Sequence, residues 1–261
     1  MSSFFAWMGG KSKIAKRLAA LLPSHDCYVE VFAGAANLLF VKDRSKVEVV
    51  NDINSDLTTL FRVVRYHPRE FMRELNLVGY SRVEFSAFRS QPGLTDIQRA
   101  ARSFFIIKAA FGGKGGTSHP YYGYSTMRRA RFRRAAFAAV RRCHKRLDGV
   151  YIENLDYAEC IRRYDRPHTV FYCDPPYLGT DGYRAAFKKP EHRRLANLLR
   201  GIKGRFLLTI NDCPETRLLY RGFSMIKLNV TYSVSRDKSP KARNRTELLI
   251  ANYPLPRSRG S

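Results

Sequence analysis

YVEVFAGAAN, residues 28–37, is typical of a strand that turns sharply into a helix. Residues 28–32 favour a buried strand, and the small residues 33–36 lead into the apolar start of a helix. A turn of small residues lets the backbone approach a ligand and leaves N–H groups free at the helix start. Because Gly34 is its only glycine, the segment also fits a plain strand-to-helix turn.

Strands and helices alternate outward from this stretch. Further strands are predicted at 46–50, 169–172, 205–210, 225–232 and 247–252, and helices at 12–22 (with Ser12 as N-cap), 55–65, 191–199 and 215–220. The alternation predicts an α/β fold with a Rossmann-like, doubly wound, mostly parallel sheet. Ligands of such sheets bind beyond the carboxyl ends of the strands, where Asn37, Asp52 and Asp174 are expected to converge.

Residues 66–150 interrupt this alternation with a polar, strongly basic and helical stretch. We therefore predict one α/β domain, expected to be catalytic, from residues 1–65 and 151–261. Residues 66–150 would form an inserted helical domain. A chain of 261 residues fits one large domain with such an insertion.

The charge balance predicts a polyanionic partner. There are 47 Lys and Arg against 22 Asp and Glu, a formal net charge of +25. A folded protein this basic repels itself unless an anion compensates, so nucleic acid is the leading candidate and an anionic membrane surface the second.

Targeting and redox signals are weak. No run of 18 apolar residues predicts a transmembrane helix, and the N-terminus does not resemble a signal peptide, so we expect a cytoplasmic protein. The five cysteines and six histidines show no metal-ligand spacing, which favours a reduced, metal-free protein.

The basic residues of the insert gather in one predicted helix. They are Arg128, Arg129, Arg131, Arg133, Arg134, Arg141, Arg142, Lys145 and Arg146. An apolar stripe runs through the same helix at Phe132, Ala136, Val140, Cys143 and Leu147. Solvated helix faces normally mix charges of both signs, whereas no acid occurs between Ile97 and Leu147. The remaining faces therefore predict a phosphate-binding surface.

A glycine-rich loop precedes this helix and carries Lys114, followed by Tyr121, Tyr122 and Tyr124. Basic and aromatic side chains in a loop suit entry into a DNA groove or stacking on a base. We expect Lys114 and Tyr122 to contact DNA, although tyrosines at this spacing also fit a hydrophobic core.

Asp174-Pro175-Pro176-Tyr177 follows the apolar strand at 169–172. Two prolines stiffen the backbone and restrict Asp174, so the segment aims a carboxylate, a carbonyl and an aromatic ring into the crevice. Asp174 and the Pro175 carbonyl can each accept one N–H of an exocyclic amine such as adenine N6. Tyr177 can stack on the base, a contact of roughly 1–3 kcal/mol. These four residues are the predicted catalytic segment, and a capped proline turn is the plainer interpretation.

Two further segments bear on a nucleotide-like ligand. Asp52 lies 18 positions after Gly34, at the end of the second predicted strand, where an acid binds ribose hydroxyls; it also fits a helix N-cap. WMGGK at 7–11 contains a Gly-Gly-Lys turn. Phe5 stands where a phosphate loop needs its first glycine, which excludes an ATPase.

These motifs occur in one order along nearly the whole chain, which resembles the Dam-like (D12 class) family of adenine-N6 DNA methyltransferases. In the subgroup concerned, the donor-binding region comes first, then the target-recognition insert, then the catalytic tetrapeptide. The resemblance is carried by WMGGK at 7–11, FAGA at 32–35, NDIN at 51–54, NLDY at 154–157, DPPY at 174–177, and closing segments at 232–235 and 245–250.

The resemblance implies S-adenosylmethionine as the methyl donor. The residues it implies around the donor are Trp7, Lys11, Phe32, Gly34, Asp52, Asp156, Tyr157 and Asp174. It implies that Asp52 binds the ribose hydroxyls and that Asp156 and Tyr157 lie near the donor's adenine. The insert departs from members that recognise GATC, because the loop after Phe111 has glycines where those members carry asparagines. We therefore expect relaxed sequence specificity.

The leading hypothesis is transfer of a methyl group from S-adenosylmethionine to adenine N6 in double-stranded DNA, with the base flipped out of the helix. Orientation and desolvation would be the enzyme's main contributions, since the amine itself is the nucleophile. One alternative is an RNA adenine methyltransferase with the same donor site. The other is a basic nucleic-acid-binding protein whose core is catalytically inactive.

Overall fold

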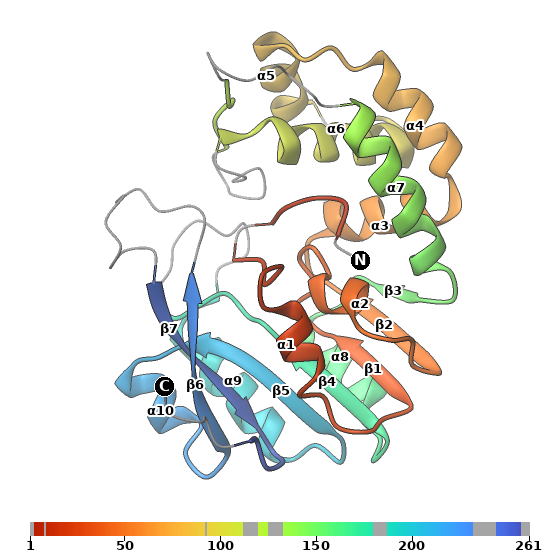
Figure 1. The fold of residues 1–261 in the computed structure, drawn as a ribbon. Coiled ribbons are helices and arrows are strands. Elements are labelled where there is room, and N and C mark those ends of the chain that lie inside the picture. Colours follow the sequence, from red (N-terminus) through yellow and green to blue (C-terminus); the bar gives the residue numbers. More distant parts are fainter. Residues whose placement is uncertain are drawn as a thin grey trace.

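The computed structural model describes residues 3–7, 9–91, 93–111, 120–124, 133–179, 187–231 and 244–256. These residues contain a seven-stranded sheet with the strand order β3-β2-β1-β4-β5-β7-β6 (Figure 1). The strands are β1 (Cys27–Glu30), β2 (Val47–Asn51), β3 (Tyr151–Glu153), β4 (Thr169–Cys173), β5 (Arg205–Asn211), β6 (Ser224–Thr231) and β7 (Asn244–Ala251). β7 is antiparallel to both β5 and β6, and the other strand pairs are parallel. The predicted doubly wound, mostly parallel α/β sheet is confirmed.

The strand order reverses between β1 and β4. From β1 the chain moves outward through β2 and β3, then returns to pair β4 with the free edge of β1. Glu30 at the end of β1 pairs with Tyr172, two residues before Asp174. Since ligands of open α/β sheets bind at such a reversal, beyond the carboxyl ends of the strands, the predicted catalytic segment lies where a ligand site is expected.

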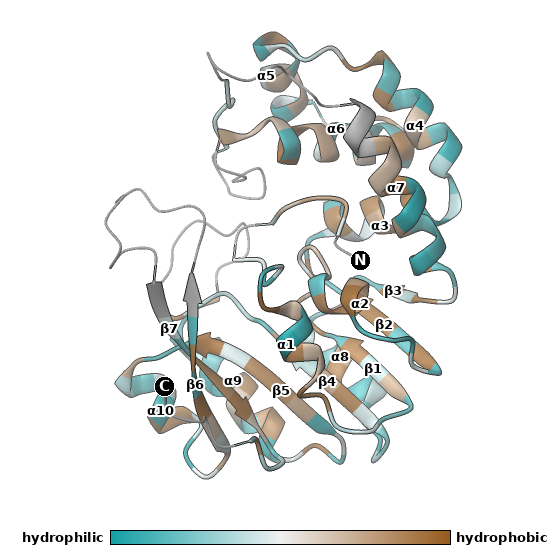
Figure 2. Cartoon of the chain, in the orientation of Figure 1, coloured by the Kyte–Doolittle hydropathy of each residue, from teal (hydrophilic) through white to brown (hydrophobic). Residues whose placement is uncertain are grey.

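The sheet is buried on both faces, and alternate residues of each strand belong to different cores. Tyr28 packs in the core that contains α1 (Ala15–Ala19) and α2 (Asn37–Val41), whereas Val29 packs in the other. That second core contains α8 (Tyr157–Tyr164), α9 (Lys189–Arg200) and Tyr220 after α10 (Pro214–Leu219). Burial on both faces explains the nearly continuous apolar strands in the middle of the sheet (Figure 2).

The region after β2 is helical. Its helices are α3 (Ser55–Tyr66), α4 (Pro68–Leu77), α5 (Arg82–Ser90), α6 (Asp96–Ala109) and α7 (Arg133–Leu147), and in Figure 1 most of them lie above the sheet. Their core is continuous with the core of α1 and α2. Phe4 makes the connection: its ring lies 6.0 Å from that of Phe61 in α3 and stacks 5.9 Å from that of Phe104 in α6. The N-terminal segment is therefore part of the hydrophobic core that holds the helical region.

A buried ion cluster joins α7 to the sheet. Glu48 in β2 accepts two hydrogen bonds from Arg146, at 2.5 and 2.8 Å, and one from Lys42 at 2.6 Å. All three side chains are largely buried. Arg146 was predicted on the phosphate-binding surface, and this part of the prediction is wrong, because its guanidinium is turned inward to pair with Glu48.

Two local features differ from the sequence-based expectation. Ser12 is not the N-cap of the first helix, which begins at Ala15 after a turn, with Ile14 as N-cap. Strand β3 was not predicted; it has three residues and lies at the edge of the sheet, too short to show a period. In α7, the stripe residues Val140, Cys143 and Leu147 are buried as predicted. Across the described ranges, no helix is both long and apolar enough to span a bilayer.

Candidate active site

Asp174 is held by two buried side chains beyond the end of β4. Thr209 in β5 donates a hydrogen bond of 2.7 Å to Asp174 Oδ1. Lys11 Nζ lies 3.0 Å from each carboxylate oxygen. Thr209 is fully buried, Lys11 is 4% exposed, and the Asp174 side chain is 17% exposed. The carboxylate is thus fixed on its buried side by Thr209 and Lys11, and its other side is open to solvent.

Lys11 connects the N-terminal WMGGK segment to the tetrapeptide. Its ammonium donates a 2.8 Å hydrogen bond to the Gly9 carbonyl and lies 4.9 Å from the centre of the Tyr177 ring. Glu247 of β7 is 4.0 Å away and only 1% exposed. Since a buried cation needs compensating charge, Lys11 is stabilised by two carboxylates and an aromatic face.

The other end of the tetrapeptide is held by Asn211. Its side-chain amide accepts from the Leu178 N–H at 3.1 Å and donates to the Leu178 carbonyl at 3.2 Å. The Asn211 side chain thus bonds both the N–H and the carbonyl of Leu178, as the backbone of an adjacent strand would. These bonds attach the residue after Tyr177 to the end of β5.

The turn after β1 forms the second half of the site. Gly34 has φ +49, a conformation that favours glycine, and a Cβ there would lie 2.8 Å from Trp7 Cδ1. The Gly34 N–H donates to Asp52 Oδ2 and the Asn54 N–H to Asp52 Oδ1, each at 2.9 Å. Burial raises the pKa of Asp52, while these hydrogen bonds oppose the shift. Trp7 and Asp52 therefore both lie against Gly34.

Asn51 positions the strand ends that flank this turn. Its amide donates to the carbonyls of Val31 and Leu155, at 3.0 and 3.2 Å, and accepts from the Leu155 N–H at 2.9 Å. Asn154 adds a 2.7 Å bond to the Asp52 carbonyl. The segment before α8 is thus tied to the ends of β1 and β2.

Asp156 and Tyr157 follow directly. Asp156 is the N-cap of α8 and accepts from the Ala158 N–H at 2.9 Å. The Tyr157 ring stacks on Phe32, with centroids 5.5 Å apart, and Phe187 packs edge-on against both. Phe32, from the FAGA segment at 32–35, and Tyr157, from the NLDY segment at 154–157, thus belong to one aromatic cluster.

The predicted DNA-binding residues fall mostly outside the described residues. Lys114, Arg128, Arg129 and Arg131 are not described, and of Arg133 and Arg134 only the backbone is, in α7. Tyr122 is half-buried in an isolated bridge with Ala110, its ring 5.5 Å from that of Phe85. Arg82 lies over Tyr122, at 5.0 Å from the ring centre, and over the exposed Tyr124, at 5.7 Å.

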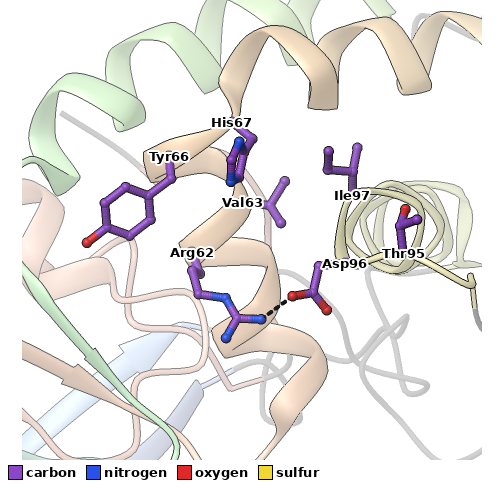
Figure 3. A pocket seen from close by; sticks show the side chains of 7 residues that line it. All are labelled: Arg62, Val63, Tyr66, His67, Thr95, Asp96 and Ile97. Atoms are coloured by element: carbon purple, nitrogen blue, oxygen red, sulfur yellow. Dashed lines mark hydrogen bonds and ion pairs between the residues drawn. The ribbon is translucent and has the colours of Figure 1, made fainter.

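A separate cavity lies away from these residues, between α3 and the start of α6 (Figure 3). Its volume is about 240 Å³, and its lining is mostly apolar, with an Arg62–Asp96 ion pair beside it. None of the predicted catalytic or donor-site residues lines it. Among the described residues, no cluster of three or more His, Cys, Asp or Glu side chains is arranged to hold a metal.

Comparison with known proteins agrees with this geometry. Residues 7–234 match the family of D12 class N6 adenine-specific DNA methyltransferases. The chain belongs to this family. It is 25% identical over 266 residues to the DNA adenine methylase of Escherichia coli (strain K12), covering 96% of this chain and 95% of that protein.

Two other relatives of this D12 methyltransferase are similar over a comparable length. The Type II methyltransferase M.CviBI of Paramecium bursaria Chlorella virus NC1A is 26% identical over 272 residues, covering 97% of this chain and all of that protein. The Retron Ec67 DNA adenine methylase of Escherichia coli is 26% identical over 269 residues, with 97% and 92% coverage. The chain is a DNA adenine-N6 methyltransferase, an enzyme that requires a methyl donor.

Sequence reasoning missed the side chains that contact Asp174, Lys11 and Leu178 in this methyltransferase. Thr209, Asn211 and Glu247 all lie on or at the ends of predicted strands, yet none was assigned a role. The available signal was a polar residue within an apolar strand: Thr209 stands between leucine and isoleucine, and buried polar groups need partners.

Glu30 is a buried acid beside the site. It is 2% exposed and accepts 3.0 Å hydrogen bonds from the Tyr28 hydroxyl and the Leu39 N–H. Burial raises the pKa of Glu30 to about 7; the negative charge of Asp174 adds to the rise, and the two hydrogen bonds oppose it. Folded Glu30 therefore keeps its proton at pH values where the unfolded chain has lost it.

Replacing Glu30 by glutamine should change how stability depends on pH. The favourable contribution of protonated Glu30 is fully present below the ordinary pKa of 4.5 and is lost as pH rises through about 7. Urea unfolding at several pH values between 4.5 and 8 measures this change. As pH rises over this range, the free energy of unfolding of Glu30→Gln should increase by about 3 kcal/mol relative to that of the wild type. Glu70→Gln, at an exposed position, is the control. If the difference in unfolding free energy between Glu30→Gln and the wild type does not change with pH, the raised pKa of Glu30 is refuted.

Proposed function

We propose that this chain transfers a methyl group from S-adenosylmethionine to adenine N6 in double-stranded DNA, with little sequence preference. The observation that carries the proposal is the fixed Asp174 carboxylate, held by Thr209 and Lys11 at the reversal of strand order. The turn that pairs Gly34 with Asp52 lies at the neighbouring strand ends. A carboxylate for the amine and a carboxylate for a ribose are what this reaction requires.

The turn after β1 fits S-adenosylmethionine. Gly34 leaves open backbone where a Cβ would strike Trp7, and each Asp52 oxygen keeps a lone pair beyond the one engaged by a backbone N–H. Asp52 would accept the ribose hydroxyls, and Phe32 and Tyr157 would border the donor's adenine. When bound, S-adenosylmethionine supplies an electrophilic methyl group next to the tetrapeptide.

The tetrapeptide would hold the target amine. Asp174 and the Pro175 carbonyl would each accept one N–H of N6, which aims the nitrogen lone pair at the methyl group, while Tyr177 stacks on the base. Lys11 already lies against Asp174 and the Tyr177 ring, so the amine would approach the open side of the carboxylate. The base reaches this position only when it is flipped out of the duplex.

The helical region would bind the DNA duplex. We propose that residues 66–150 supply this surface and that residues 1–65 and 151–261 carry the chemistry. Its predicted arginines, apart from the buried Arg146, and Lys114 would neutralise phosphates, which makes binding salt-dependent. Tyr122 would contribute through its exposed part, next to Arg82, whose guanidinium lies 5.0 Å from the Tyr122 ring centre and 5.7 Å from that of Tyr124. The glycines that replace asparagines after Phe111 leave few groups to read base edges, which supports relaxed specificity.

Sequencing of exposed DNA tests the proposal directly. Unmethylated duplex DNA incubated with the protein and S-adenosylmethionine should carry N6-methyladenine in many sequence contexts when read by single-molecule sequencing. A single strict recognition motif would contradict relaxed specificity without affecting the assigned reaction.

Tritiated S-adenosylmethionine provides the substrate control. Label should appear in duplex DNA, and an RNA of matched sequence should receive far less. Exclusive labelling of RNA would refute the proposed substrate, and tight DNA binding without donor consumption would identify an inactive binding protein.

A further inference from the structure

Strand β5 carries two polar side chains that contact the two ends of the catalytic segment. Thr209 and Asn211 are two residues apart, so both point to the same face of the sheet. Thr209 bonds to Asp174, the first residue of the tetrapeptide, and Asn211 bonds to Leu178, the residue after its tyrosine. The intervening prolines allow little backbone movement, so fixing both ends fixes the whole segment.

The direction of the hydrogen bonds at Thr209 follows from the available protons. Asp174 as a carboxylate can only accept, so the single Thr209 hydroxyl proton is used in the 2.7 Å bond to Oδ1. Tyr172 lies 3.2 Å from the same Thr209 oxygen and must therefore donate its own proton. Burial and the nearby Asp174 charge raise the pKa of Tyr172, which keeps it a donor. A chain of donors thus runs from Tyr172 through Thr209 to Asp174.

This chain makes the two Asp174 oxygens unequal. Oδ1 accepts the Thr209 hydrogen bond and also lies 3.0 Å from Lys11 Nζ, whereas among the described residues Oδ2 accepts only the 3.0 Å hydrogen bond from Lys11. A carboxylate has about four acceptor positions, two on each oxygen. Oδ2 therefore has more capacity than Oδ1 to accept a further N–H. Without the Thr209 bond, only Lys11 would hold the carboxylate among the described residues, and the carboxylate could rotate about its Cβ–Cγ bond.

We propose that Thr209 and Asn211 are positioning residues for methyl transfer. Thr209 orients Asp174 so that Oδ2 faces the target amine, and Asn211 holds Leu178 so that Tyr177 stays in place. The inference rests on the proposed function, because it assigns Asp174 the amine. It goes beyond that function in naming the acceptor oxygen and the two side chains that select it.

Thr209→Val tests the first contact. Valine has nearly the shape of threonine without the hydroxyl, so folding should survive while kcat for methyl transfer falls about 10- to 100-fold. KM for DNA and the affinity for S-adenosylmethionine should stay close to wild type, since Thr209 is fully buried behind Asp174. Trp7 is the only tryptophan and lies against Gly34, so its fluorescence reports donor binding independently of turnover.

Three further variants separate positioning from general packing. Thr209→Ser keeps the hydroxyl and should restore most of kcat. Asn211→Ala should lower kcat on the order of 10-fold. Thr169→Val removes a similarly buried strand hydroxyl, bonded at 2.8 Å to the Tyr164 carbonyl at the opposite end of β4, and should leave kcat unchanged.

Each outcome decides one question. Wild-type kcat in Thr209→Val, with wild-type methylation of adenine N6, would overturn the positioning role alone. An equal loss in Thr169→Val, or no recovery in Thr209→Ser, would also overturn it, because the effect would then follow from packing. A wild-type chain that binds the donor but methylates no adenine would instead overturn the proposed function, and the inference with it.

Discussion

Asp174→Ala should lower methyl transfer by on the order of 10³-fold or more, because it removes the group that holds and orients the target amine. Folding should survive the change. Lys11 would lose its nearest carboxylate, but Glu247 lies 4.0 Å from the same ammonium and keeps the cation compensated. Single-turnover transfer of tritiated methyl groups to duplex DNA measures the effect without interference from product release.

DNA binding provides the contrast in the same variant. The affinity of Asp174→Ala for duplex DNA, and its dependence on salt, should stay near wild type, since the basic residues that bind phosphate are unchanged. Asp43→Ala is the matched control: it removes one exposed carboxylate and should leave the rate of transfer unaltered. Turnover of Asp174→Ala near the wild-type rate would contradict the assignment of Asp174.

Glu48→Gln should cost about 3–5 kcal/mol of unfolding free energy. Glutamine has nearly the same shape but no charge, so Lys42 and Arg146 would remain buried without their shared carboxylate. The loss should appear as a lower denaturation midpoint in urea. Because Arg146 belongs to α7 and Glu48 to β2, the change also loosens the attachment of the helical region to the sheet.

An exposed ion pair shows what burial contributes. Arg163 and Glu159 pair at 2.9 Å in α8, with both side chains about half exposed. Glu159→Gln should therefore cost less than about 1 kcal/mol. Equal costs for Glu48→Gln and Glu159→Gln would show that the buried cluster contributes no more than a surface pair.

The central strands were predictable because parallel strands buried on both faces appear as apolar runs in the sequence. Residues 169–172 and 205–210 were located in this way, within a residue of β4 and β5. The edge strand β3 lacks such a run: Tyr151 is more than half exposed. Short edge strands depend on a neighbour for their conformation, and the neighbour, β2, is about 100 residues away in sequence.

The candidate site was predictable where a motif is local and unpredictable where it depends on pairing. Asp174 and Gly34 stand in recognisable segments, and the Gly34–Asp52 contact follows from strand order. Thr209 becomes important only because β5 pairs with β4 in a register that brings its hydroxyl to Asp174. Arg146 was misassigned for the same reason, since only the fold brings Glu48 to the basic helix.

The packing of Phe4 against Phe61 and Phe104 has a consequence for protein engineering. Exchanging recognition regions between related enzymes treats residues 66–150 as a detachable module. Removing them here would expose Phe4 and Phe61, each worth about 1.5–3 kcal/mol when buried. A chimera should therefore transplant the N-terminal residues before Trp7 together with the helices, so that the graft brings its own partner for Phe104.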